Sequence, residues 1–257
     1  MHVLFTIRTA VPGGCDPRVP SLRAVKAAWY PDELAHAGAE HLDAAYVATY
    51  DRKAGVDPQA ELSLLQRFGL DASSTLVDLG AGTGTITLAA AEICRRVVAV
   101  DVSPAMVSAL RRRAAERDLR NVECVQSGFL TYQHAGAAVD FVYARHALHQ
   151  LPDFWKVIAL QRIAGFLKPG GILRVRDLFL SCEPDEVHTV IEAWLANAAA
   201  TSDVGWTRAE LETHLREEHT TFTWLFERML EHTGFEIREA SYTESRTHTG
   251  YVCAKVL

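Results

Sequence analysis

Short apolar strands alternate with amphipathic helices through the middle of the chain. Each predicted strand is a short, mostly apolar run, and each predicted helix carries apolar residues at helical spacing. Strands that alternate with helices form a parallel sheet covered on both faces. The predicted strands are Thr75–Leu79, Val97–Val100, Val122–Val125, Val139–Tyr143 and Ile172–Val175; the predicted helices are 58–68, 85–94, 103–118 and 154–167, and 168–171 is a predicted turn.

The alternation stops after Asp177. Residues 184–218 predict a helical insertion, and Phe222–Thr233 predicts a further helix. Phe235–Tyr242 and Gly250–Val256 are strands close together in sequence, which favours an antiparallel pair. We therefore expect an α/β fold with a seven-stranded, mostly parallel sheet, an antiparallel C-terminal edge hairpin, helices on both faces and a helical lid.

The residues that precede this pattern predict a separate N-terminal region. Residues 1–22 are rich in proline and glycine and predict an irregular arm, whereas 23–54 predict short helices. The expected organisation is thus an arm with cap helices at 1–54 and a cofactor-binding domain at 55–257. The insertion at about 184–218 forms the lid of this domain, together with the cap helices.

The amino-acid composition limits the kinds of molecule that the chain is expected to bind. The chain has 257 residues with 26 Lys and Arg against 32 Asp and Glu, a net charge of −6, whereas nucleic-acid binders usually present a basic face. Five cysteines are scattered without CxxC spacing, and no apolar run reaches the length of a membrane span. We expect a reduced, cytoplasmic protein without nucleic-acid or membrane partners, either a monomer or a homodimer.

A glycine-rich loop, Gly80-Ala81-Gly82-Thr83-Gly84, lies between a predicted strand and a predicted helix. Glycine permits a tight turn and close approach of the backbone to a ligand. Asp101 ends the next strand, where a carboxylate can bind both ribose hydroxyls. Asp101 could instead only cap the following helix, but Ser103 is better placed for that role.

The loop differs from that of a dinucleotide-binding enzyme. A dinucleotide loop has a third glycine at the position that Thr85 occupies here. Asp78, two residues before the loop, adds nothing to pyrophosphate binding but suits an α-amino group. These features favour S-adenosylmethionine, with S-adenosylhomocysteine as its product, over a nicotinamide cofactor.

Four segments in order resemble motifs of the class I S-adenosylmethionine-dependent methyltransferases, of the small-molecule type related to ubiquinone and menaquinone biosynthesis enzymes. The resemblance implies a Rossmann-like fold, with Asp101 on the ribose and Val102 and Met106 on the adenine. The four segments are Val77–Gly84, Val98–Met106, Ala144–Pro152 and Leu167–Gly171. The expected cofactor-binding residues are Tyr50, Asp78, Gly80, Ala81, Gly82, Thr83, Gly84, Asp101, Val102, Met106, Ser127, Gly128, Phe129 and Arg145.

The chain departs from the family after the third strand. The family usually has Gly-Asp there, with the carboxylate on the adenine amino group, whereas this chain has Ser127-Gly128-Phe129. The Phe129 amide or the Ser127 hydroxyl is then left to hold the adenine.

Methyl transfer needs alignment and exclusion of water, with a base where the nucleophile holds its proton tightly. His149 and Asp177 follow predicted strands and are the candidate catalytic residues; loop packing and capping are their structural alternatives. The expected substrate and lid residues are Tyr30, Tyr46, His146, Trp194 and Trp224. A metal site at His214 and His219 is disfavoured, because their spacing does not share one helix face.

The sequence therefore predicts methyl transfer to an O, N or C atom of a small, apolar or aromatic acceptor. Two alternatives stay open. One is an RNA methyltransferase, which the acidic balance disfavours. The other is a protein that binds S-adenosylmethionine as a scaffold or sensor without transferring the methyl group.

Overall fold

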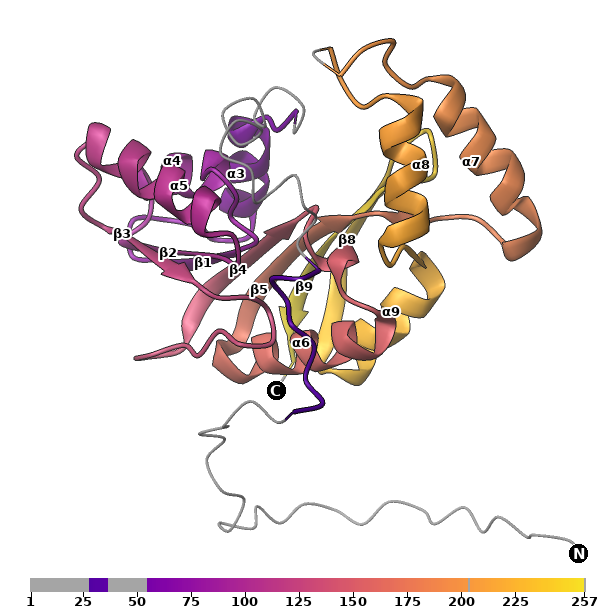
Figure 1. Cartoon of the computed structure of the whole chain (residues 1–257). Coiled ribbons are helices and arrows are strands. Elements are labelled where there is room, and N and C mark those ends of the chain that lie inside the picture. Colours follow the sequence, from indigo (N-terminus) through magenta and orange to yellow (C-terminus); the bar gives the residue numbers. More distant parts are fainter. Residues whose placement is uncertain (1–27, 37–54, 203, 257) are drawn as a thin grey trace, which may run out of the picture. The chain divides into compact units, whose positions relative to one another are not determined.

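The computed structural model describes residues 28–36, 55–202 and 204–256 (Figure 1). Residues before Asp32 form a separate unit, and those from Asp32 onward form the unit described below. In the first unit, the ring of the exposed Trp29 lies 4.7 Å from that of Tyr30. Residues 28–36 form turns, so the predicted short helix is wrong over this stretch; the other residues of the predicted arm and cap lie outside the described residues.

A seven-stranded sheet in the order β3-β2-β1-β4-β5-β9-β8 forms the centre of the second unit. Every neighbouring pair is parallel except the two that include β9, so the predicted mostly parallel sheet with an antiparallel C-terminal hairpin is confirmed. The strands are β1 (Thr75–Leu79), β2 (Arg96–Asp101), β3 (Val122–Gln126), β4 (Val139–Arg145), β5 (Leu167–Asp177), β8 (Phe235–Tyr242) and β9 (Thr249–Lys255).

Helices cover both faces of this sheet. In Figure 1, α3, α4 and α5 lie on one face, α6 and α9 lie on the other, and α7 and α8 stand beyond the end of the sheet. The helices are α3 (Pro58–Arg67), α4 (Thr85–Ala91), α5 (Pro104–Glu116), α6 (Asp153–Phe166), α7 (Val187–Ala196), α8 (Arg208–Glu217) and α9 (Thr223–His232). The central strand β1 is buried along its whole length, as expected for a parallel strand between two helical layers.

Local capping explains where two of these helices begin. The side chain of Asp57 accepts hydrogen bonds from the amides of Gln59 and Ala60, and Pro58 occupies the first turn of α3. Ser103 accepts from the amide of Met106 at 3.1 Å and caps α5. The capping role therefore belongs to Ser103, as the sequence indicates, and leaves Asp101 for another one.

Three details differ from the sequence-based predictions. The Lys168–Gly171 segment lies inside β5 rather than in a separate turn, because Leu167 pairs with Val139 and the register then shifts. The insertion is not helical throughout: α7 and α8 are separated by a segment in which Ala199 bridges to Thr207. A two-stranded parallel pair, β6 (Phe179–Leu180) with β7 (Thr221–Phe222), joins the two ends of the insertion.

The parallel register brings the carboxyl ends of the strands to one edge of the sheet. Leu79 pairs with Val100 and with Ala144, and Asp101 pairs with Gln126. The loops after β1, β2, β3, β4 and β5 therefore meet at this edge, which is where ligands bind in open parallel sheets.

Candidate active site

The loop after β1 needs its glycines. Gly80, Gly82 and Gly84 all have positive φ, at 73°, 55° and 91°. A Cβ on Gly80 would lie 2.3 Å from the Cβ of Ala147 in the loop after β4. The loop thus packs directly against the β4 loop, and Gly84 begins α4 in the left-handed conformation without a side-chain cap.

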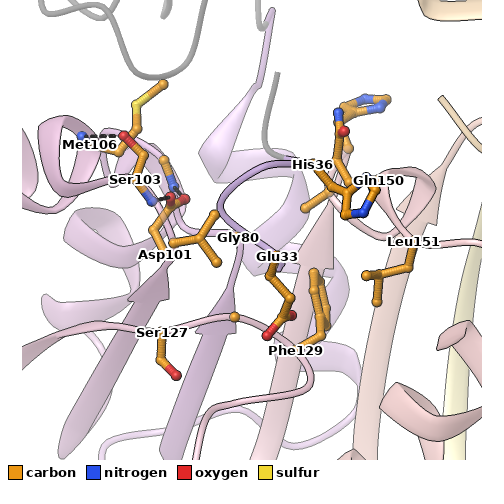
Figure 2. Close-up of a pocket in the computed structure, with 15 residues that line it drawn as sticks. Glu33, His36, Gly80, Asp101, Ser103, Met106, Ser127, Phe129, Gln150 and Leu151 are labelled. Atoms are coloured by element: carbon orange, nitrogen blue, oxygen red, sulfur yellow. Dashed lines mark hydrogen bonds between the residues drawn. The ribbon is translucent and has the colours of Figure 1, made fainter. Parts of the chain in front are cut away.

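Asp101 fastens this loop to the end of β2. One carboxylate oxygen accepts from the amide of Gly82 at 2.8 Å, and the other accepts from the amide of Ser103 at 2.8 Å (Figure 2). Burial raises the pKa of this carboxyl above its usual range. Each oxygen keeps a lone pair for a further donor, such as a hydroxyl.

Asp78 lies at the other end of the loop. It is buried, accepts from the Thr87 hydroxyl at 2.6 Å, and has its pKa raised to about 7, mainly by burial. Arg145 lies in the same part of the site and bonds Glu61 at 3.4 Å. The buried Nε of Arg145 has no hydrogen-bond partner among the residues that the structure describes.

Two pockets follow the carboxyl ends of the strands. The first, here called the β2–β3 pocket, is lined by Glu33, His36, Asp101, Val102, Ser103, Met106, Ser127, Gly128, Phe129, Gln150 and Leu151 (Figure 2). The second, the β1–β4 pocket, is lined by Asp78, Ala81, Thr83, Thr85, Tyr143 and Arg145. Gly80, Gly82 and His146 line both, so the two pockets meet at the glycine loop.

A third hollow, the α7–α8 cavity, has a volume of about 390 Å³. Trp194, Trp206 and Leu211 supply apolar walls, so the cavity contains Trp194, one of the lid residues expected from sequence. The histidines and the acid that line it are His146, His149, His214, His248 and Glu218. Trp224 is not among the lining residues: it is 45% exposed and stacks on Phe222.

His149 is held between two carboxylates. Its Nδ1 lies 2.5 Å from an Asp177 oxygen, and its Nε2 lies 3.2 Å from Glu218. Burial opposes the imidazolium charge, but Asp177 and Glu218 outweigh it and raise the pKa of His149. Both ring nitrogens thus face protein groups, which is a poor arrangement for a general base toward a substrate.

Asp177 shapes the loop after β4. Its second oxygen accepts from the amides of Ala147, Leu148 and His149 at 3.2, 2.7 and 3.2 Å. Burial alone would raise the pKa of this carboxyl. The charge and the hydrogen bond of His149 lower the pKa by more than burial raises it, so the carboxyl stays ionised. These hydrogen bonds tie the end of β5 to the loop after β4.

His146 lies where the three hollows meet. It lines the β2–β3 pocket, the β1–β4 pocket and the α7–α8 cavity, and its backbone adopts a positive φ of 47°. Such a φ is uncommon outside glycine and often marks a functional position. Burial holds the pKa of His146 well below its usual range, so the imidazole is neutral at pH 7.

Some residues predicted from the sequence lie outside the described part of the second unit, and some residues that line the site were not predicted from the sequence. Tyr46 and Tyr50 lie outside the described residues, and Tyr30 belongs to the other unit. Glu33 and Glu218 line the site, but neither belongs to a recognisable motif, because tertiary packing alone brings them there. Glu218 is also linked to His214 at 2.6 Å, a helical i, i+4 pair that sequence spacing could have indicated.

Metal-binding and membrane-spanning features were also sought in the described part of the chain. No group of three or more His, Cys, Asp or Glu side chains is placed there to hold a metal ion. None of its helices combines the length and apolar character that crossing a bilayer requires.

Comparisons with known proteins agree with this geometry. Residues 76–171 match the model of the methyltransferase domain family. Trans-aconitate 2-methyltransferase of Azoarcus sp. strain BH72 is 35% identical over 120 residues, which are 46% of this chain and 44% of that protein. The chain spans about half or less of the length of the curated relatives it matches.

Solved structures share the fold at low sequence identity. Magnesium protoporphyrin IX methyltransferase of Synechocystis PCC 6803, solved with S-adenosylmethionine bound, has a TM-score of 0.59 and 12% identity, covering 88% of this chain and 99% of that one. The (4+2)-cyclase SpnF has a TM-score of 0.58 and 18% identity, covering 77% and 80%. Residues 76–171 are thus similar in sequence to the methyltransferase domain family, and the chain shares the fold of solved methyltransferases, with the sheet order and the glycine loop in agreement.

Proposed function

We propose that the chain transfers a methyl group from S-adenosylmethionine to a protic small molecule held in the α7–α8 cavity. The observation that carries this proposal is the position of His146, which lines both strand-end pockets and the cavity. A donor in the two pockets and an acceptor in the cavity would meet at this one side chain.

The residues of the two pockets fit the cofactor. Asp101 offers lone pairs to a ribose diol, and Val102 and Met106 offer apolar contacts to a base. The β1–β4 pocket presents the acid Asp78 and the partnerless Nε of Arg145, which suit the ammonium and the carboxylate of an amino acid. When bound, S-adenosylmethionine supplies a methyl group activated by a sulfonium.

The protein would contribute mainly alignment and exclusion of water. His146 is neutral, so its imidazole has a lone pair that can accept the proton that a hydroxyl or amine loses as the methyl group is transferred, although burial lowers its basicity. We assign His149 and Asp177, the candidates from sequence, to positioning, because Asp177 fixes the amides of the His146 loop and His149 bridges to Glu218. We therefore propose His146 as the base, three residues before His149, the candidate from sequence.

The cavity lining favours an acceptor with an apolar body and a hydrogen-bond donor. No lysine or arginine is among the described residues that line it, and two tryptophans are. The Glu218 oxygen that faces Nε2 of His149 at 3.2 Å accepts no hydrogen bond from the described residues, so it keeps capacity for a further donor. A substrate hydroxyl or amine would satisfy it, whereas a polycarboxylate such as trans-aconitate would face a carboxylate.

Methyl-labelled S-adenosylmethionine tests this function. Purified protein is incubated with a metabolite extract, with total RNA and with a protein extract, and label is counted in each. Label in the small-molecule fraction is expected. The variant Glu218→Gln should cut it by about tenfold or more, the loss of one charged hydrogen bond. Glu217→Gln, an exposed neighbour on α8, is the matched control.

Other outcomes would replace the proposal. Label found only in RNA would establish the nucleic-acid alternative. Tight binding of S-adenosylhomocysteine without label in any pool would favour a non-methylating role, an alternative kept because one fold neighbour is a cyclase.

A further inference from the structure

Glu33 is a buried acid that lines the β2–β3 pocket and lies in a turn that precedes α3 in the chain. It lies in a turn at residues 32–36, is 7% exposed, and lines the pocket together with Asp101 and Met106. One carboxylate oxygen accepts from the amide of Leu130 at 2.9 Å, and the other accepts from the hydroxyl of Thr131 at 2.8 Å. Figure 2 shows the carboxylate beside Phe129.

Gly128 makes room for this carboxylate. A Cβ on Gly128 would lie 2.3 Å from one oxygen of Glu33 and 2.7 Å from the other. The backbone of Gly128 does not have positive φ, so the turn itself does not require glycine there. Glycine at position 128 therefore leaves room for Glu33. The carboxylate of Glu33 occupies the space in which a side chain at position 128 would begin.

The carboxylate still has capacity to accept hydrogen bonds. Each of its oxygens accepts one bond from the protein and has about two lone pairs, so each can accept another. The pocket between Asp101 and Glu33 is walled by Val102, Met106 and Phe129, which suits a flat aromatic base. The ligand group that a carboxylate at this end would recognise is an exocyclic amino group.

We infer that Glu33 is the adenine-recognising residue of the site and reads the 6-amino group of the cofactor. This rests on the proposed use of S-adenosylmethionine and extends it to a residue 95 positions before Gly128, outside the residues that match the domain family. The turn at 32–36 then forms part of the cofactor site, and Gly128 and Glu33 form a complementary pair.

The test compares S-adenosylhomocysteine with S-inosylhomocysteine, in which an oxygen replaces the amino group. Calorimetry with the wild-type chain should show tighter binding of the adenosyl compound by about tenfold or more, since a carboxylate repels the inosine oxygen. In Glu33→Gln the amide can donate to that oxygen. The preference should therefore fall to about threefold or less, or reverse.

A role limited to holding the 128–131 loop predicts a different result. Glu33→Gln would then weaken both ligands equally and leave their ratio unchanged, which overturns the inference. Asp32→Asn, an exposed acid in the same turn, is the control and should change neither affinity nor ratio. Thermal melts confirm that each variant is folded.

A second set of variants tests the pairing without relying on Glu33→Gln. Gly128→Ala should weaken S-adenosylhomocysteine in the wild-type background, because the new methyl group displaces the carboxylate. In a Glu33→Ala background, Gly128→Ala should change the affinity for S-adenosylhomocysteine by about twofold or less. Equal effects in both backgrounds would contradict the pairing.

The failure of this inference and that of the proposed function are distinguishable. A wild-type chain that binds neither ligand defeats both. Binding with the expected discrimination but without methyl transfer defeats only the proposed function. Methyl transfer with a ratio unaffected by Glu33→Gln defeats only the role of Glu33.

Discussion

The strand-end pockets and the α7–α8 cavity are built in different ways. The pockets come mainly from loops that directly follow β1, β2 and β3, so the parallel register places them. The cavity comes from the loop after β4, an insertion of two helices, and the turn before β9. The first region is set by the sheet, which explains its likeness to distant methyltransferases, and the second depends on this chain's own packing. A change in a residue that lines only one region should therefore leave the other intact.

The largest expected effect is on ligand affinity at the donor side, which is our name for the two strand-end pockets proposed to bind S-adenosylmethionine. Asp101→Ala removes the bonds to the amides of Gly82 and Ser103 as well as the proposed ribose contact. We expect S-adenosylhomocysteine to bind about 10- to 100-fold more weakly, or about 1.5–3 kcal/mol, because charged hydrogen bonds are lost. Calorimetry measures this. Asp101→Asn, which keeps one acceptor, should lose less, and an unchanged affinity in Asp101→Ala would remove this residue from the site.

A change on the proposed acceptor side, the α7–α8 cavity, should reduce methyl transfer and leave the affinity for S-adenosylhomocysteine unchanged. Trp194 lines the cavity but neither pocket. Trp194→Ala should reduce label transfer into the small-molecule fraction by about tenfold, from the loss of an aromatic contact. Its affinity for S-adenosylhomocysteine should stay within about twofold of the wild type. Trp224→Ala is the matched control, since Trp224 lies outside the cavity. Equal losses in both tryptophan variants would show that the cavity is not the acceptor site.

The sequence predicts well how the residues of the strand-end pockets come together, since these residues directly follow strands or begin helices. The glycine loop, Asp101 and the Ser103 cap follow strands or begin helices that hydrophobic periodicity identifies. Parallel pairing then brings them together. The same reasoning identifies the order of the main strands and helices. It fails where strand pairing extends beyond the apolar run, as in Leu167–Gly171, and it misses the β6–β7 pair and the non-helical segment of the insertion.

The sequence predicts the acceptor side less well. It places His146 and His149 on one loop, but only the fold shows that both ring nitrogens of His149 face Asp177 and Glu218 whereas His146 lines both pockets and the cavity. Periodicity identifies Trp194 and Trp224 as helical apolar positions without showing which helix covers the cavity. Glu33 has no sequence signal, because it reaches the site from a turn far along the chain.

The pH dependence of binding should separate the two pockets of the donor side. Asp78 has its pKa raised to about 7 and must be ionised to hold an ammonium group. Lowering the pH protonates it, so S-adenosylhomocysteine should bind about tenfold more weakly at pH 6 than at pH 8. Calorimetry across this range should show that dependence in the wild type. Asp78→Asn should bind more weakly at pH 8 with a flatter profile, and an equally steep profile in that variant would assign the titration to another group.

The smallest expected effect comes from the surface contact that holds the start of the insertion. Arg246, in the turn between β8 and β9, bonds both oxygens of Glu186 at 3.0 and 2.7 Å and the carbonyl of Ser181 at 3.1 Å. Both side chains of the ion pair are more than a third exposed, so Glu186→Gln should lower the free energy of unfolding only slightly. Denaturant melts at low and high salt measure this, and the loss should shrink with salt. Affinity for S-adenosylhomocysteine should not change, because the contact lies on the cavity side alone. A clear loss of that affinity would mean that the insertion and the strand-end pockets are energetically coupled, and the division between the two regions would then fail.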